Sequence, residues 1–382
     1  MTQAYSEVRR GKRRSDNEGI RLKTNRYKAF RDPELVRKLR ERIARLSHTD
    51  LKIMEFCGTH THAICKFGIR ELLPETIEMF SGPGCPVCVT DQADMDYAIA
   101  LAKVPRAIIT TFGDLLKVPG SHGSLQNARA EGATVEVVYS PLDALDFARR
   151  NPDRPIIFLG VGFETTAPTV AASVLEAARQ GLNNFYVYSM HKLTPPAMRA
   201  ILDAKEISLS GILCPGHVST VIGWQVWNFL AERYGIPAAV AGFEPADVLW
   251  AVAEIVVQHE SHRAEIVNTY PRCVTPEGNA AAQAVMKQVF EPGAARWRGL
   301  GLIPDSGLTL KTEYQAFDAK KAFQVDPGET ILPEGCHCGD IIRGVMQPDA
   351  CPLFRQVCNP MQPVGPCMVS TEGTCAAYYQ YG

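Results

Sequence analysis

At 382 residues the chain is long enough for two or three ordinary domains, and its content of 46% hydrophobic and 21% charged residues is that of an average globular protein. A net charge of −1 gives no reason to expect nucleic acid or an anionic membrane as a partner. The sequence has no run of about 18 apolar residues, so we predict no transmembrane span. It also has no apolar leader segment, which predicts a cytoplasmic protein.

The first segment of the chain is basic, with nine Lys or Arg residues against three acidic ones in residues 1–28, and we expect it to be a disordered tail. Asp32-Pro33 then predicts the start of a helix, with Asp as N-cap and Pro in the first turn. Apolar residues recur on one face of this helix, at Leu35, Leu39, Ile43 and Leu46.

After this helix, short apolar runs end in turn residues and alternate with helical stretches, a pattern that predicts α/β architecture with parallel sheets. The runs are LKIMEF, ETIEMF, RAIITTF, ATVEVVY, RPIIFLG, NNFYVYS, LSGILC and IPAAVA. We expect two similar parallel-sheet α/β domains of four strands each, at 29–145 and 146–265. The pattern breaks near residue 270, so we expect a third, cysteine-rich domain at 266–382.

Unusual residues gather in the loops that follow these predicted strands. In open parallel sheets, the loops at the carboxyl ends of the strands carry ligands. The residues found there are Cys57, His60, Cys85, Cys88, Asp114, Glu164, Thr165, His191, His217 and Glu244. We therefore expect a functional site at these strand ends.

Six of the twelve cysteines lie in the last 47 residues. Four of them, Cys336, Cys351, Cys358 and Cys375, have wide and irregular spacing, with Cys338 and Cys367 as further thiols. Iron–sulfur clusters take four thiolates, whereas structural zinc sites made of four cysteines usually show two close pairs. The spacing favours a cluster and leaves a zinc site or unligated cysteines open.

The N-terminal cysteines, Cys57, Cys85 and Cys88, can hold a soft or borderline metal as thiolates. Cys85 and Cys88 form a C-x-x-C motif, so they can instead cycle between dithiol and disulfide. Glu164 and His217 are candidates for acid–base groups in a cleft. Their neighbours Thr165 and Ser219 stand where helices could begin, so helix capping is an equal alternative.

Five motifs in order resemble the HypD family of hydrogenase maturation proteins, and the resemblance runs from about residue 30 to the C-terminus. The motifs are CGTHTH (Cys57–His62), GPGCPVC (Gly82–Cys88), GFETTAPT (Gly162–Thr169), CPGHVS (Cys214–Ser219) and CMVSTEGTCAAYY (Cys367–Tyr379). The resemblance implies two similar α/β domains and a third domain that holds a [4Fe-4S] cluster. Its ligands would be Cys336, Cys351, Cys358 and Cys375, with Cys338 competing with Cys336 and Cys367, more weakly, with Cys375.

The resemblance also implies a function. Proteins of this family are scaffolds on which the Fe(CN)2CO group of [NiFe]-hydrogenase is assembled, together with a small HypC-type chaperone. Cyanide comes from a HypE-type donor that a HypF-type protein loads. Cys57, Cys85 and Cys88 match the cysteines that handle iron and undergo thiol redox chemistry, and we expect Glu164, His217 and His191 to line the cleft as proton-handling groups.

Two other functions remain open at this point. A ferredoxin-dependent disulfide reductase needs only a cluster and the C-x-x-C motif, so it would not depend on Cys57. A structural protein stabilised by zinc would be colourless when purified. The sequence favours an assembly scaffold with redox activity over a free-standing enzyme.

Overall fold

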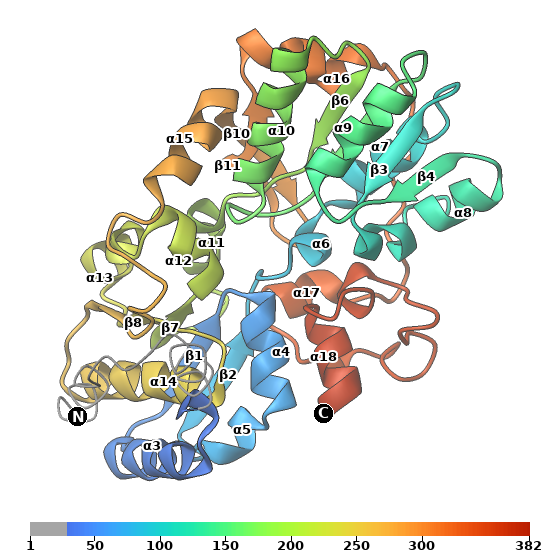
Figure 1. Ribbon diagram of the computed structural model, residues 1–382. Coiled ribbons are helices and arrows are strands. Elements are labelled where there is room, and N and C mark those ends of the chain that lie inside the picture. Colours follow the sequence, from blue (N-terminus) through green and yellow to red (C-terminus); the bar gives the residue numbers. More distant parts are fainter. Residues whose placement is uncertain (1–28) are drawn as a thin grey trace, which may run out of the picture.

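The computed structural model describes residues 29–382 and shows an α/β chain with two separate parallel sheets, which confirms the predicted fold class (Figure 1). The first sheet has the order β2 (Ile77–Ser81), β1 (Leu51–Glu55), β7 (Gly211–Cys214), β8 (Ala238–Val240) and β9 (Ile266–Asn268). The second sheet has the order β4 (Thr134–Val137), β3 (Ile108–Thr111), β5 (Ile156–Gly160) and β6 (Phe185–Ser189). The expected basic tail at 1–28 lies outside the described residues.

The division of strands between the sheets differs from the predicted domains at 29–145 and 146–265. The chain leaves the first sheet after β2, builds the whole second sheet, and then returns to the first. On its return, β7 pairs with β1, with Ile53 opposite Gly211 and Glu55 opposite Leu213. The first sheet also has five strands rather than four, because β9 pairs with β8 inside the region expected to form the third domain.

Helices cover both sheets. Their bounds in the first half of the chain are η1 (Ala29–Arg31), α3 (Pro33–Leu46), α4 (Gly58–Lys66), α5 (Ile69–Leu72), α6 (Pro86–Val89), α7 (Gln92–Leu101), η2 (Gly113–Lys117), α8 (Leu125–Ala130), α9 (Pro141–Arg150) and α10 (Ala167–Gln180). Those that follow are α11 (Thr194–Ala204), α12 (Gly216–Ile222), η3 (Gln225–Asn228), α13 (Phe229–Tyr234), α14 (Pro245–Glu260) and α15 (Ala280–Val289).

The predicted N-terminal helix forms as α3, and the Asp32 side chain accepts a hydrogen bond from the backbone N–H of Glu34 at 3.1 Å. Leu39 and Ile43 are buried against α14 and one face of the first sheet, whereas Leu35 stays exposed. On the second sheet, α9, α10 and α15 pack over a separate core that includes Phe158 and Phe185.

Beyond α15 the chain forms an antiparallel hairpin of β10 (Phe290–Trp297) and β11 (Gly301–Leu310). The remaining elements are short: η4 (Thr312–Phe317), α16 (Ala319–Ala322), α17 (Cys338–Ile342), η5 (Pro348–Ala350), η6 (Pro366–Met368) and α18 (Thr374–Tyr381). In Figure 1 the C-terminal segment, in red, lies against α4 and α6, and contacts of α18 with α4 and of η6 with α6 join them. The cysteine-rich end of the chain is therefore packed at the strand ends of the first sheet.

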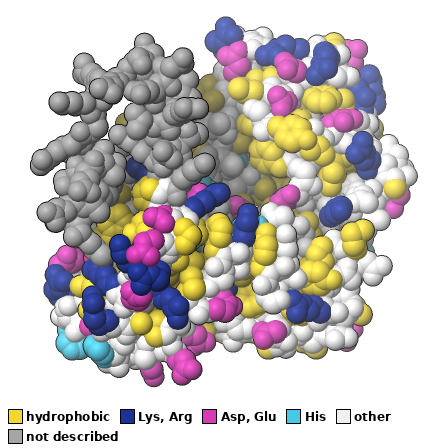
Figure 2. Space-filling view, turned by 60° about the horizontal axis from the view of Figure 1, so that its bottom comes forward, with side chains coloured by type: hydrophobic (Ala, Val, Ile, Leu, Met, Phe, Trp, Pro, Cys, Tyr) yellow, Lys and Arg dark blue, Asp and Glu magenta, His cyan; other side chains and the backbone are white. Residues whose placement is uncertain are grey.

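Two general properties of the described residues bear on partners. No helix among them is both long enough and apolar enough to cross a membrane. On the face drawn in Figure 2, the basic and acidic side chains are interspersed, in keeping with a net charge of −1 for the chain.

Candidate thiol site

Cys57 follows β1 and stands at the N-cap of α4, where it is 7% exposed. The carboxylate of Glu55, fully buried, accepts a hydrogen bond from the Cys57 backbone N–H at 2.8 Å and another from the Thr61 hydroxyl. Burial raises the pKa of Glu55 to about 7 and that of the Cys57 thiol to about 12, the latter aided by the charges of Glu372 and Glu55. In this structure Cys57 is therefore a protonated thiol at neutral pH.

Cys85 and Cys88 are joined by a disulfide, with their Cα atoms 5.2 Å apart. Cys85 is the N-cap of α6, and its sulfur accepts a hydrogen bond from the Cys88 backbone N–H at 3.2 Å. The loop before them passes directly over Cys57, because a Cβ on Gly84 would overlap the Cys57 backbone. The Gly84 carbonyl also accepts a hydrogen bond from the Gly58 N–H at 2.9 Å. The Gly-Pro-Gly sequence thus brings the C-x-x-C loop and Cys57 together.

A second group of thiols surrounds a small pocket in the C-terminal segment. Its lining consists of Cys336, Cys338, Cys351, Cys358 and Cys375, together with Ile341, Leu353, Phe354 and Met368. The sulfurs of two of these cysteines face Gly365, where a Cβ would come within 2.7 Å of Cys336 Sγ and 2.5 Å of Cys338 Sγ. The structure brings all four predicted cluster ligands to this pocket, and it brings Cys338 there as well.

Cys367 lies between the two groups of cysteines. It lines a second pocket with Cys85, Cys88 and the loop Gly82–Gly84, and the sulfur of Cys88 is 3.9 Å from the Pro366 carbonyl oxygen. Side-chain hydrogen bonds with Cys338 and Cys375 raise the pKa of the Cys367 thiol. Side-chain hydrogen bonds with Cys338, the larger effect, and with Cys367 lower the pKa of Cys375 to about 6.

Thr59 and Glu372, two polar residues that were not predicted from the sequence, contact each other close to Cys57. The Thr59 hydroxyl donates to Glu372 at 2.6 Å and lies 3.4 Å from Nδ1 of His217, whose ring stacks on Phe243. Partial burial lowers the pKa of His217. Close packing supports this arrangement, since a Cβ on Gly58 would come within 2.6 Å of Glu372 Cβ.

The same C-terminal loop reaches the second sheet, because the Ser370 hydroxyl donates to Asp114 at 2.8 Å. Both Ser370 and Glu372 belong to the quoted motif CMVSTEGTCAAYY, where the polar residues between the two cysteines were the available signal. His217 thus lies beside Thr59, two residues after Cys57, and Asp114 is linked to the C-terminal loop.

Glu164 and His191 belong to different surroundings. Glu164 is buried, and its carboxylate accepts hydrogen bonds from the Thr194 N–H at 2.8 Å and hydroxyl at 2.9 Å, at the start of α11. Burial raises its pKa to about 7. His191 is buried beside Ser189 and Phe290, and burial lowers its pKa to about 3. These bonds hold the Glu164 carboxylate against the first turn of α11, whereas Thr166, at the N-cap of α10, makes no side-chain capping hydrogen bond.

Within residues 29–382 no three His, Cys, Asp or Glu side chains are arranged to hold one ion. The thiols of the C-terminal pocket instead line a cavity, and soft thiolates around a cavity are the donor type that iron–sulfur clusters use.

The fold and the thiols together define a class of protein. It is an α/β protein with two parallel sheets, in which Cys57 follows a strand and a C-x-x-C disulfide lies beside a C-terminal segment rich in cysteine. A family model named HypD and described as the hydrogenase formation hypA family matches residues 34–382. The chain belongs to the HypD family, as its motifs predicted.

Curated relatives agree over nearly their whole length. The chain is 44% identical to the hydrogenase maturation factor HypD of Escherichia coli, over 92% of this chain and 96% of the relative. It is 46% identical to the factor of that name from Rhodobacter capsulatus, over 92% and 97%. A putative hydrogenase expression/formation protein of Methanocaldococcus jannaschii is 44% identical, over 92% and 98%.

Proposed function

We propose that the chain is a cytoplasmic scaffold for assembly of the Fe(CN)2CO group of [NiFe]-hydrogenase. The single observation that carries the proposal is that the C-x-x-C loop packs on the Cys57 backbone, while the Cys85–Cys88 disulfide shares a pocket with Cys367, whose thiol bonds Cys338 and Cys375 of the C-terminal pocket. A scaffold needs a thiol for iron beside a source of electrons, and these cysteines would supply both groups. Family membership supports the same role.

In this proposal the iron is cargo and Cys57 is its anchor, shared with a thiolate of a HypC-type chaperone. Low-spin iron with cyanide and carbonyl ligands is soft, which suits thiolate. Because burial holds Cys57 protonated in the structure, binding of iron must displace the thiol proton. Glu55, with a pKa of about 7 and a bond to the Cys57 backbone, is the nearest candidate to receive it.

The C-terminal pocket is the proposed site of a [4Fe-4S] cluster, held by Cys336, Cys351, Cys358 and Cys375. When bound, such a cluster supplies one electron at a time. Cys338 lines the same pocket and its sulfur is directed at Gly365 together with that of Cys336, so it stays a competitor. Cys367 lies on the side of the disulfide and is the weaker candidate.

In the proposed thiol chemistry, a one-electron donor protein would pass two electrons through the cluster, one at a time, and with two protons these convert the Cys85–Cys88 disulfide to a dithiol. A thiocyanate-type donor, R–S–CN, then takes those two electrons and two protons to give R–SH and HCN, and the disulfide forms again. The donor would be a HypE-type partner loaded by a HypF-type protein.

A ferredoxin-dependent disulfide reductase is the alternative, and the closeness of the disulfide to the cysteine pocket is compatible with it. The position of Cys57 favours the scaffold, because its backbone is packed beneath Gly84 and its neighbour Thr59 bonds Glu372. A disulfide reductase needs only the cluster and the Cys85–Cys88 pair, so it would not require Cys57.

The test is infrared spectroscopy of the anaerobically purified complex with its chaperone. Replacing Cys57 by Ala should abolish the cyanide and carbonyl bands, while Cys273→Ala, at an exposed cysteine, is the matched control and should keep them. Bands that persist without Cys57 would overturn the anchor role. Full disulfide reductase activity in the same variant would favour the alternative, and a colourless preparation would favour a zinc protein.

A further inference from the structure

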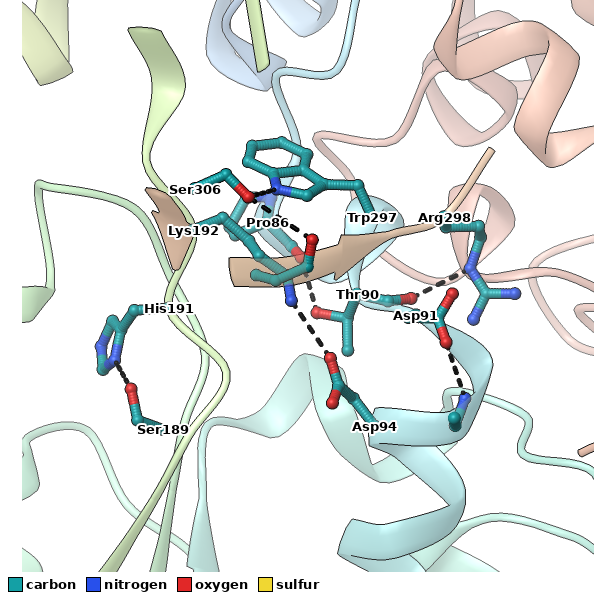
Figure 3. A network of polar contacts seen from close by, with 12 residues as sticks. Pro86, Thr90, Asp91, Asp94, Ser189, His191, Lys192, Trp297, Arg298 and Ser306 are labelled. Atoms are coloured by element: carbon teal, nitrogen blue, oxygen red, sulfur yellow. Dashed lines mark hydrogen bonds and ion pairs between the residues drawn. The ribbon is translucent and has the colours of Figure 1, made fainter. Parts of the chain in front are cut away.

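Arg298 is a buried arginine in the turn after β10, and it holds the C-x-x-C helix and the residues after it. Its backbone N–H donates to the Val89 carbonyl at 2.9 Å, and its side chain is packed inside, since the residue is 6% exposed. Nε donates to the Thr90 carbonyl at 3.0 Å (Figure 3). Nη1 donates to Oε1 of Gln92 at 3.0 Å. Every partner of Arg298 is thus an uncharged oxygen.

The charge of Arg298 has no carboxylate partner in residues 29–382. Its Nη2 is buried and forms no hydrogen bond. Asp91 is drawn near it in Figure 3, but its carboxylate accepts from the Ala93 N–H at 3.1 Å as a helix cap. The buried Lys192 nearby differs, because it forms an ion pair with Asp94 at 3.1 Å. A buried, unpaired cation is costly, so an anion is expected beside it.

The C-terminal cysteine pocket lies on the other side of this turn. Gly299 follows Arg298 and packs against Gly339 of α17, the helix that begins with Cys338, since a Cβ on Gly299 would come within 2.6 Å of Gly339 Cα. The turn that carries the buried Arg298 is therefore in direct contact with the first turn of the helix that carries Cys338, one of the thiols lining the pocket.

We propose that Arg298 is the counter-cation of the C-terminal cysteine pocket and sets the reduction potential of the group bound there. The inference rests on the proposed function, which assigns an iron–sulfur cluster to this pocket. A cluster with four thiolate ligands is anionic and becomes more so on reduction, so a buried cation stabilises its reduced form more than its oxidised form. Because Arg298 also bonds Thr90 and Gln92, the same residue fixes the disulfide helix against the pocket.

The test is a dye-mediated redox titration of the anaerobic, full-length protein, followed by electron paramagnetic resonance. In Arg298→Gln the ratio of reduced to oxidised cluster at a fixed potential should fall at least tenfold, equal to 59 mV for a one-electron couple. Arg298→Lys keeps the charge and should lie between this variant and the wild type. The matched control is Arg355→Gln, an exposed arginine beside Phe354 of the pocket, which should shift the ratio by less than about threefold.

An unchanged or higher midpoint potential in Arg298→Gln would overturn the inference and leave the proposed function intact. If Arg298→Gln purifies without iron and sulfide, the cluster content of Arg298→Lys is measured instead. A cluster retained in Arg298→Lys would support the need for a positive charge, and loss of the cluster in both variants would overturn the inference. A wild-type protein without iron and sulfide would overturn both this inference and the cluster of the proposed function.

Discussion

Glu164→Gln tests whether the buried carboxyl of Glu164 is a structural group. Its pKa of about 7 lies above its ordinary value of 4.5, so the folded state resists ionisation and wild-type stability falls as pH rises from 4.5 to 7. Linkage puts the loss at about 1 kcal/mol at pH 5 and about 3 kcal/mol at pH 8. Glutamine never ionises, and its amide can keep both contacts because the Thr194 hydroxyl can accept as well as donate.

The free energy of unfolding in urea should therefore rise in Glu164→Gln, relative to wild type, by about 2 kcal/mol more at pH 8 than at pH 5. Taking the difference between two pH values cancels any constant change in hydrogen bonding. Glu131→Gln, at an exposed carboxylate after α8, controls for the loss of one charge. A difference that does not vary with pH would refute the raised pKa, and loss of the infrared bands of the complex would show that Glu164 takes part in assembly.

Three further substitutions probe the thiol site itself. Gly84→Ala should destabilise the protein by about 1–3 kcal/mol in thermal or urea unfolding, because its Cβ would overlap the Cys57 backbone, whereas Gly113→Ala, which meets only an ordinary contact, should be tolerated. Glu372→Gln removes a charge that raises the pKa of Cys57, so alkylation of that thiol should become faster at pH 8; an unchanged rate would contradict the assignment. Gly365→Ala would direct a methyl group at two sulfurs of the pocket, so bound iron and sulfide should fall, and full occupancy would speak against a cluster there.

The strands were predictable because β-branched and aromatic runs between turn residues identify strands locally. All eight predicted runs form strands, but their grouping could not be derived, because a local pattern does not specify which strand pairs with which. The placement of β7 beside β1 depends on pairing between Ile53 and Gly211, which lie far apart in the chain. β9 has three half-buried residues, too few to give a periodic signal.

The cysteines of the site were predictable by residue type and spacing, whereas their polar neighbours were not. Glu372 contacts Thr59 across 313 positions of the sequence, and it stands in a segment without regular periodicity. For Glu164 the sequence and the structure point to different roles. Its position after a strand predicted an acid–base group, yet its carboxylate accepts a hydrogen bond from Thr194. Position at a strand end therefore selects candidates, and only packing separates a capping carboxylate from one that faces the thiols.

One local signal does carry information about the packing of the site, and it is glycine beside cysteine. Gly58 follows Cys57 and packs against Glu372, and Gly84 precedes Cys85 and packs against Cys57. Gly365 faces two pocket sulfurs in the same way. At each position a Cβ would occupy the space where two distant segments meet, so each glycine reports a contact rather than a turn alone. The Gly-Pro-Gly before Cys85 therefore explains how a loop of the first sheet can pack directly on the Cys57 backbone and, on the same side, against Cys367 and Glu372 of the C-terminal segment.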